Sequence, residues 1–357
     1  MTARTLIMTA SESANRSEQP FLQRLDSEAR ALLLSVARAV SFPKGARLVR
    51  HGQAARGAYV VRSGSAEALV SLPGGDSISV AEVNAGSMFG ETALLERGTC
   101  SASVLATSAL EGWFIERDDF RALIAQHGTA ALRLQHEITL ILCEKLRRLN
   151  DKVLACPAPE DRQAGAEGSG DPLAGVERRQ RVDFDHRPLL PLLPALQEFS
   201  DSEFDRLNAS SALIELPRGH AVFSRGQPSQ ACYIVVRGAV EVNARHAERE
   251  RRLAVLGPGQ LFGFMSLLEG GAHGASARVR ESAVLLELPK SAFDELYLGA
   301  SAAATKLHRA IHRSLLGSLA QTNRMLTRLL SQARLRGDRG ESDMLEVAYS
   351  GQIVATD

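Results

Sequence analysis

The fold is decided by the stretch Gly86-Ser-Met-Phe-Gly-Glu-Thr-Ala-Leu-Leu-Glu-Arg-Gly-Thr-Cys-Ser-Ala-Ser-Val104. This pattern is typical of a strand end, a tight glycine turn, one short helical turn and a return strand. Gly90 lets the backbone approach a ligand closely, because glycine has no Cβ. The residues after it, Glu91, Thr92 and Ala93, would expose free amide donors, which bind anionic groups at the start of a helix. One such loop is a weak signal, and it gains weight here because the pattern occurs twice.

The chain is a tandem repeat of one domain. Turn glycines and apolar residues recur in the same order after a shift of 174 residues and, past one deletion, after a shift of 173. The matched pairs include Gly45 and Gly219, Gly52 and Gly226, Tyr59 and Tyr233, Phe89 and Phe262, Gly90 and Gly263, Leu94 and Leu267, Glu96 and Glu269, and Phe120 and Phe293. A period this long indicates two copies of a whole domain, since solenoid repeats are much shorter.

The composition of the segments predicts the domain boundaries. Residues 1–20 are polar and are expected to be a disordered tail, and residues 21–156 form the first domain with its C-terminal helix. Residues 157–186 are rich in proline, glycine and charge, as in a flexible linker. The second domain, with its long C-terminal helix, spans 187–335, and 336–357 form a second tail.

Each copy begins with a helix, continues in glycine-punctuated β segments and ends in a long helix. Asp26 or Ser27 is the expected N-cap of the first helix. Short β segments separated by glycines predict an antiparallel roll or sandwich. The final helix carries an apolar stripe at helical spacing: Leu307, Ile311, Leu315, Leu319, Leu326 and Leu329. Two explanations stay open for this stripe: packing on its own domain, or dimerisation because one small roll cannot cover the whole helix.

Composition limits the function. The net charge of +1 lacks the basic field that non-specific nucleic-acid binding needs. The N-terminal apolar run is too short for a signal peptide, and no run approaches the ~20 apolar residues of a membrane span. We therefore expect a cytoplasmic protein without a membrane segment. No residue pattern supports catalysis or a metal site, so we expect neither an enzyme nor a metalloprotein.

This arrangement resembles the cyclic nucleotide-binding domain family, which includes the bacterial catabolite activator and the regulatory subunits of cyclic-AMP-dependent kinase. The stretch Gly57-Ala-Tyr-Val-Val-Arg-Ser-Gly64 is similar to the family's roll strand, and Phe89-Gly-Glu-Thr-Ala-Leu94 to its phosphate-binding cassette. The resemblance implies a mainly β fold with flanking helices. Two double-stranded β-helix (jelly-roll-like) domains would each be followed by a long C-terminal helix.

The resemblance also implies a ligand site in the first copy. The amides after Gly90 would hold the cyclic phosphate of cAMP or cGMP, and Glu91 would accept the ribose hydroxyl. The family arginine that neutralises the phosphate falls on Ser101, preceded by Cys100. The candidate site is therefore Gly90, Glu91, Thr92, Ala93, Ser101 and Ala102.

The second copy departs further from the family. Phe264 stands at the glutamate position, and Gly274, with His273 beside it, stands at the arginine position. Both charged contacts are missing, so we expect this copy not to bind cyclic nucleotides. Loss of the arginine contact in either copy would reduce affinity about 10- to 100-fold.

These observations favour a non-catalytic regulatory protein without a cofactor, with a cyclic nucleotide or an atypical ligand as the candidate for the first domain. The signal would pass through the C-terminal helices to a protein partner or a second copy. A catabolite-activator-like transcription regulator and a ligand-free interaction scaffold are the alternatives. DNA binding is disfavoured because no basic recognition helix is apparent after the final helix.

Overall fold

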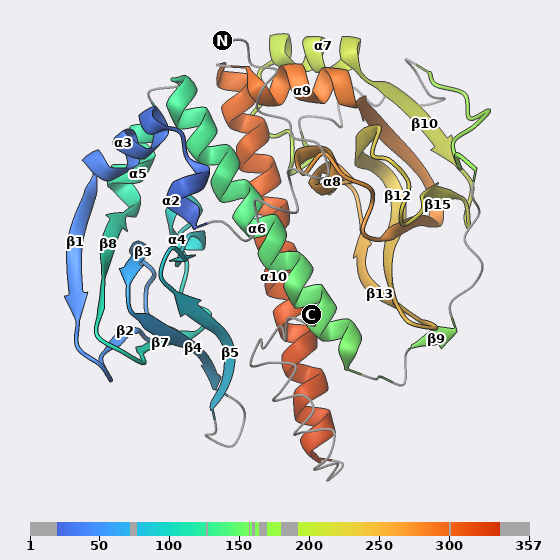
Figure 1. The fold of residues 1–357 in the computed structure, drawn as a ribbon. Helices are drawn as coiled ribbons and strands as arrows, with labels where there is room; N and C mark the ends of the chain where they lie inside the picture. The colour runs from blue at the N-terminus through green and yellow to red at the C-terminus, as the bar shows by residue number, and fades with distance from the viewer. Residues whose placement is uncertain are drawn as a thin grey trace, which may run out of the picture. The chain divides into compact units, whose positions relative to one another are not determined.

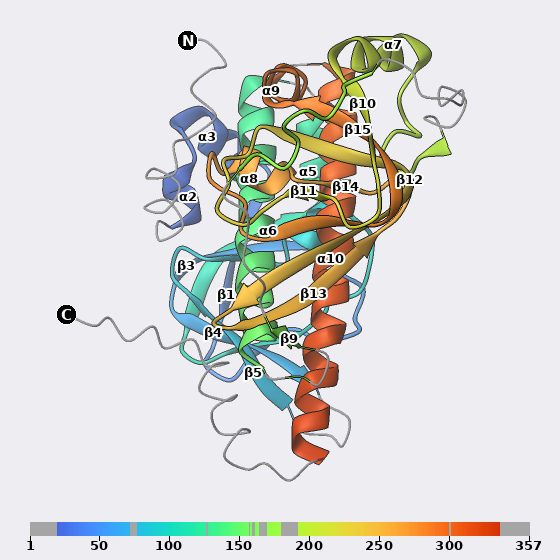
Figure 2. The same cartoon turned by 90° about the vertical axis from the view of Figure 1, so that its right-hand side faces the viewer.

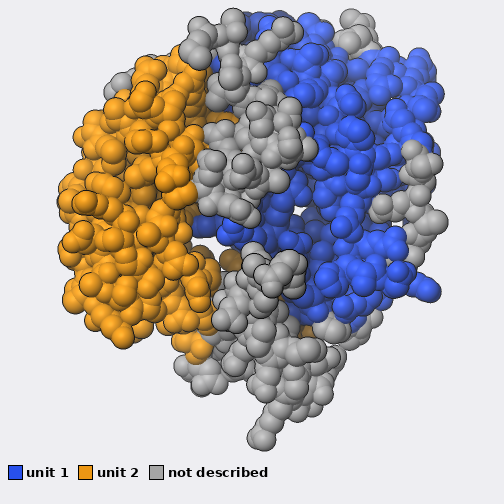
Figure 3. Space-filling model, viewed as in Figure 1, with its two compact units in different colours: residues 1–17, 142–320 blue, residues 18–141, 321–357 orange. Residues whose placement is uncertain are grey.

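The computed structural model describes residues 20–71, 77–125, 128–156, 158, 161–163, 170–179, 192–299 and 301–335. The chain divides into two compact units (Figure 3), which we describe separately. Unit 2, orange in the figure, comprises residues 18–141 and 321–357 and contains the first roll. Unit 1, blue, comprises residues 1–17 and 142–320 and contains the second roll. Apart from Pro20, the expected tails 1–20 and 336–357 lie outside the described residues.

Two four-stranded antiparallel sheets form the first roll (Figure 1). One sheet has the order β1-β8-β3-β6, with β1 at Ala37–Phe42, β8 at Leu110–Glu116, β3 at Gly57–Ser63 and β6 at Met88–Phe89. The other has the order β2-β7-β4-β5, with β2 at Arg47–Val49, β7 at Ser103–Ala106, β4 at Ser65–Ser71 and β5 at Ser77–Asn84. This is the predicted mainly β fold.

Helices cover one face of the first roll. They are α2 (Phe21–Arg24), α3 (Ser27–Ser35), α5 (Arg117–Ile124) and the start of α6 (Thr129–Ala155). Of the two N-cap candidates that the sequence offers, Asp26 caps α3 by accepting a 2.8 Å hydrogen bond from the Ala29 amide, and Ser27 is the first residue of the helix. Fully buried side chains such as Leu33, Phe120 and Leu134 belong to one core cluster with strand residues, so apolar burial holds these helices to the sheet.

The second roll repeats this plan with longer strands (Figure 2). Its sheet has the order β10-β15-β12-β13-β9, with β11 on β15 and β14 on β12. The strands are β9 (Arg162–Gln163), β10 (Ala212–Leu216), β11 (Ala221–Phe223), β12 (Ala231–His246), β13 (Arg249–Leu256), β14 (Leu261–Phe262) and β15 (Ser276–Pro289). The helices are α7 (Asp201–Ser210), α8 (Phe264–Leu268), α9 (Lys290–Leu298) and α10 (Ala302–Leu335).

Equivalent hydrogen bonds confirm the register of the repeat. Tyr59 pairs with Phe89 in the first roll, and Tyr233 pairs with Phe262 in the second. The same equivalence holds for two backbone bonds: Gly86 N to Val61 O matches Gly259 N to Val235 O, and Gly52 N to Cys100 O matches Gly226 N to His273 O. The two shifts read from the sequence are therefore structural equivalences, and a residue in one copy identifies its counterpart in the other.

The apolar stripe of α10 is buried within a single chain. Leu307, Ile311 and Leu315 are at most 4% exposed, and Leu326 and Leu329 at most 5%. The division into units assigns 302–320 of this helix to unit 1 and 321–335 to unit 2. Leu319, the remaining stripe residue, is half-buried. Most of the stripe is thus covered without a second copy, and dimerisation stays a prediction. None of the described helices combines the length and apolar character that a membrane-spanning helix needs.

Part of the stretch 157–186, predicted to be a linker, is described, and it packs on the second roll. Leu173 is 3% exposed and belongs to the core cluster of that roll. Arg178 donates from Nε and Nη2 to the carboxylate of Glu287 on β15, at 2.6 and 3.2 Å. β9 adds to the edge of β13. These contacts attach the two described segments 161–163 and 170–179 to the second roll.

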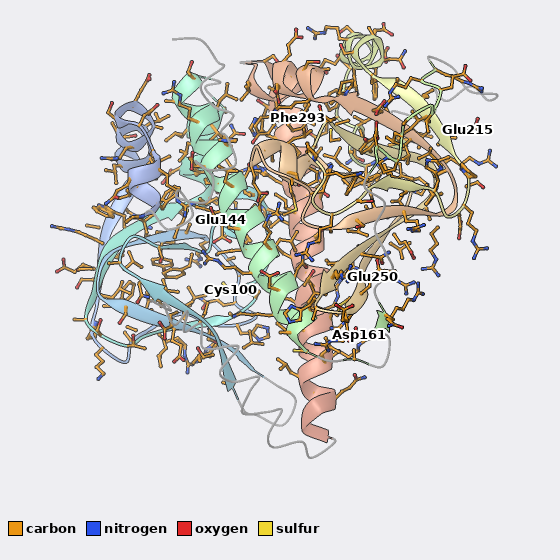
Figure 4. All side chains as sticks on the ribbon, turned by 45° about the vertical axis from the view of Figure 1, so that its right-hand side comes forward. Cys100, Glu144, Asp161, Glu215, Glu250 and Phe293 are labelled. Carbon is orange, nitrogen blue, oxygen red and sulfur yellow. The ribbon has the colours of Figure 1, made fainter. Side chains whose placement is uncertain are left out.

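Arg251 on β13 holds the carboxyl end of α6. Its side chain is 3% exposed and donates to the carbonyls of Val153 and Cys156, each at 2.5 Å. It also bonds both carboxylate oxygens of Asp161, at 2.6 and 2.8 Å (Figure 4 labels Asp161). A cation suits the negative end of a helix dipole and satisfies carbonyls that lack helical partners. The carboxyl half of α6 is therefore anchored to the second roll.

Candidate functional site

The first cassette turns at Gly90, which has a positive φ of 77°. A Cβ at this position would lie 2.8 Å from the carbonyl oxygen of Gly57, closer than real Cβ contacts come. The conformation and the space both require glycine, as the sequence predicts. The turn leads directly into α4 (Thr92–Leu95).

The predicted ligand amides are placed at the start of α4, but they are not equivalent. The Ala93 amide donates to the Gly90 carbonyl at 2.9 Å, so this amide is engaged within the turn. Thr92 is half-buried, and Glu91 is 2% exposed. Burying a carboxylate costs free energy unless polar groups pair with it. Glu91 is such a carboxylate, and it stands at the position that the resemblance implies for the ribose contact.

Arg117 positions this short helix, and the sequence analysis missed it. Its Nε donates to the carbonyl of Ala93 at 2.8 Å, and its Nη2 donates to the carbonyl of Ala55. The Arg117 amide also donates to the Arg56 carbonyl at 2.9 Å. One side chain at the start of α5 thus ties α4 to the loop before β3. The only sequence signal was an arginine at the end of a β segment, which is not diagnostic.

Cys100, and not Ser101, occupies the inward position of the return loop. The backbone of Cys100 exchanges two hydrogen bonds with Gly52 and Gln53, and its side chain is half-buried. Cys100 also interacts electrostatically with Tyr59. The pKa of the Tyr59 phenol is raised mainly by burial and secondly by Cys100. Ser101 is exposed and Ala102 half-buried. The register of the repeat could have identified Cys100, because it aligns with His273.

Aromatic rings surround Tyr59 in the first roll. Tyr59 stacks on Phe89 at 4.9 Å between ring centroids and lies 4.8 Å from Phe114. Phe42 makes an edge contact with Tyr59 at 6.1 Å. The four rings form a rigid apolar wall behind the cassette, of the kind that small-ligand sites use beside a few polar groups.

The second cassette keeps the turn but differs in its side chains. Gly263 has a positive φ of 83°, and Phe264 is 4% exposed. His273, the counterpart of Cys100, stacks on Phe223 with the ring centroids 3.7 Å apart. Burial, and then the charge of Arg147, lowers the pKa of His273 to about 4, so its imidazole is neutral at pH 7. Phe223 and Leu173 belong to the same core cluster, so apolar side chains of the chain itself occupy the region beside this cassette.

Metal binding was not predicted, and the described residues contain no group of three or more metal-ligating side chains. The two histidines of α10 are packing residues. His308 donates from Nε2 to the Tyr297 carbonyl at 3.1 Å and stacks on the Tyr297 ring, and His312 makes an edge contact with His308.

Comparison with known proteins matches both copies to one family. The model of the cyclic nucleotide-binding domain matches residues 39–127 and 213–299. Among curated proteins, the chain is 46% identical to the cyclic AMP receptor protein of Thermus thermophilus over 23% of this chain and 37% of that protein. It is 32% identical to glutaminase 1 of Bradyrhizobium diazoefficiens over 40% of this chain and 22% of that protein. It is 24% identical to the cAMP-dependent protein kinase regulatory subunit of Mycosarcoma maydis, over 61% and 34% of the two chains.

The matches span well under two thirds of the length of each of these relatives. Among solved structures, the regulatory domain of Toxoplasma gondii PKA with cAMP is 18% identical over 78% of this chain and 88% of that chain, with a TM-score of 0.30. The N-terminal domain of a transcriptional regulator from Streptomyces coelicolor is 23% identical over 38% and 93% of the two chains, with a TM-score of 0.33.

Proposed function

Because residues 39–127 and 213–299 belong to the cyclic nucleotide-binding domain family, we propose that this chain is a non-catalytic sensor whose first roll binds a cyclic nucleotide. One observation carries the proposal. The first cassette combines the left-handed turn at Gly90 with a nearly buried carboxylate, Glu91, at the position that the family uses for the ribose. The second cassette has the turn but an apolar ring, Phe264, in place of that carboxylate. The first roll is therefore the better candidate.

The affinity of this site would be low for its family. Neither Ser101, on which the resemblance places the family arginine, nor Cys100, the more buried residue before it, supplies a positive charge to the phosphate. A charge-assisted phosphate contact contributes roughly 1.5–3 kcal/mol, which corresponds to about 10- to 100-fold in affinity. A micromolar family-like site would thus move toward the sub-millimolar range. The ligand would be a cyclic nucleotide at high local concentration, or a related anion.

The output of the sensor would be a protein partner or a second copy of the chain. The helices that follow each roll, α6 and α10, would transmit the change. The relatives named as kinase regulatory subunits support a role in protein regulation, although they match this chain only in part. The partner itself would recognise helix faces other than the buried apolar stripe of α10.

Isothermal titration of cAMP and cGMP into the full chain tests the proposal. Saturable heat that disappears in Glu91→Ala, and persists in Glu96→Ala, is the expected result, because Glu96 is an exposed glutamate of the same loop. The absence of binding up to millimolar nucleotide would overturn it. That outcome would favour the second candidate, a ligand-free interaction scaffold, which the lack of an arginine at Cys100 and Ser101 supports.

A further inference from the structure

The second cassette loop holds a cation from its own chain. Arg147 lies on α6, about one turn after Glu144, which Figure 4 labels. Its guanidinium donates to the carboxylate of Glu269, the residue that follows α8. Arg147 Nε lies 2.9 and 3.0 Å from the two carboxylate oxygens of Glu269, and Nη2 also bonds Oε2. The contact is bidentate: two guanidinium nitrogens bond the two carboxylate oxygens, the geometry in which arginine binds a carboxylate most specifically.

This pair is better shielded than a surface ion pair. The side chain of Glu269 is 13% exposed and that of Arg147 is 35% exposed. Exposed pairs contribute little because water screens them, whereas breaking a buried pair leaves a charge without a partner. Burial alone would lower the pKa of Arg147, but the hydrogen bonds and charge of Glu269 raise it above its usual value.

Gly274 makes room for the guanidinium. A Cβ at this position would lie 2.2 Å from Arg147 Nη1, so this nitrogen, at the end of a flexible side chain, would have to shift to admit one. The counterpart of Gly274 in the first copy is Ser101, and the counterpart of Glu269 is the exposed Glu96. The glycine and the shielded glutamate therefore occur together only in the copy that receives an arginine.

The charges around the guanidinium favour a cation in this loop. Glu269 faces it directly, Asp151 of α6 adds a weaker negative potential, and Cys143 is a buried thiol whose pKa burial raises. His273 is neutral because burial and Arg147 lower its pKa to about 4. A phosphate placed here would face the Glu269 carboxylate, so an anionic ligand is disfavoured.

We propose that the second cassette has become a guanidinium-binding site, formed by Glu269 and the space beside Gly274, with Arg147 of α6 as its resident ligand. The site then serves to dock the carboxyl half of α6 on the second roll. Arg251 holds the end of the same helix through Val153 and Cys156. The two contacts lie within unit 1 and together fix residues 147–155 of the helix and Cys156 after it.

Hydrogen–deuterium exchange of the full chain tests this site in residues 264–274. Arg147→Ala should raise the exchange rates of these amides about tenfold, because the loop loses the contact that closes it. Arg148→Ala is the matched control, since Arg148 is the exposed neighbour on the same helix. It removes the same charge from α6 and should leave the rates unchanged.

Chemical rescue tests the ligand class. Guanidinium chloride at tens of millimolar, far below denaturing concentrations, should restore most of the protection lost in Arg147→Ala, whereas equal concentrations of sodium or methylammonium chloride should not. Rates in Arg147→Ala that equal those in Arg148→Ala would overturn the proposal, and so would equal rescue by all three salts.

A second variant covers the case in which Arg147→Ala fails to fold. Gly274 has no positive φ, so Gly274→Ala suits the backbone and only displaces the guanidinium. It should raise exchange in 264–274 less than Arg147→Ala does, because only Nη1 has to shift while Nε and Nη2 bond Glu269. Unchanged exchange in Gly274→Ala would mean that Nη1 does not occupy this space.

Discussion

An arginine introduced at Cys100 should convert the first cassette into a tighter nucleotide site. Cys100 is half-buried, is held by two backbone bonds to Gly52 and Gln53, and lies close enough to Tyr59 to affect the pKa of that phenol. A side chain at this position therefore starts toward the aromatic wall behind the cassette. Ser101, the next residue, is exposed.

The expected gain follows from the energy of one charge-assisted contact. A guanidinium that reaches a phosphate contributes roughly 1.5–3 kcal/mol net. At about 1.4 kcal/mol per decade, Cys100→Arg should lower the dissociation constant for cAMP about 10- to 100-fold. Ser101→Arg adds the same net charge on the solvent side and should change the constant less than about threefold, since solvent and salt screen it.

Titration calorimetry of the two variants and the unmodified chain measures this difference, with thermal unfolding as a check of the fold. Removal of Glu91 in the Cys100→Arg background should abolish the new binding. The reasoning would be refuted if Ser101→Arg gained as much affinity as Cys100→Arg, because the inward position would then be misassigned. A failure of both variants to gain affinity would refute the claim that the first cassette still recognises a cyclic phosphate.

Three further perturbations test the framework. Arg251→Ala should destabilise the second roll by up to about 3–5 kcal/mol in urea unfolding, because the buried carbonyls of Val153 and Cys156 lose their donor. Asp161 would keep only the Ala158 amide and Arg249, at 3.0 and 3.5 Å. The exposed Arg252→Ala should cost under about 0.5 kcal/mol. Gly90→Ala should cost roughly 1–3 kcal/mol and reduce nucleotide binding, since alanine is strained at a φ of 77°. Burial lowers the pKa of His308 to about 4 and that of His312, which also feels the charge of His308, to about 3. Both histidines take up protons on unfolding, so the free energy of unfolding, measured by urea titration, should fall as pH drops from about 6.5 to 4, by at most about 1.4 kcal/mol per pH unit for each.

The sequence predicted the fold and the repeat because both depend on local signals. Positive φ at Gly90 and Gly263 requires glycine, and the strand pairing of Tyr59 with Phe89 recurs in the second copy, so the spacing of these residues carries the architecture. Glycines mark the turns, and the spacing of apolar residues marks the buried face of each strand and helix, so both can be identified from the sequence alone.

The side chains around the cassettes could not be predicted in the same way. Arg117 reaches Ala55, which is 62 residues away, and Arg147 reaches Glu269, which is 122 residues away. Nothing in the local pattern of an arginine on a helix indicates such a partner. The sequence could not show whether Cys100 or Ser101 turns its side chain inward. The backbone hydrogen bonds of Cys100 with Gly52 and Gln53 decide this, and they lie in a short irregular loop.

The two contacts on the carboxyl half of α6 limit how a ligand could act through that helix. Differential binding to two conformations typically supplies about 1–3 kcal/mol of coupling energy. Release of residues 147–155 would require the Arg251 contacts and the Arg147 pair to separate together, and each contact adds to the coupling energy that a ligand in the first roll would have to supply. The two contacts therefore oppose movement of this part of the helix. Any response would instead be absorbed in the part of α6 that belongs to unit 2, residues 129–141, or in the loop before it. The variants Arg147→Ala and Arg251→Ala would lower this barrier, so they should extend a ligand-induced change in exchange into the carboxyl half of the helix.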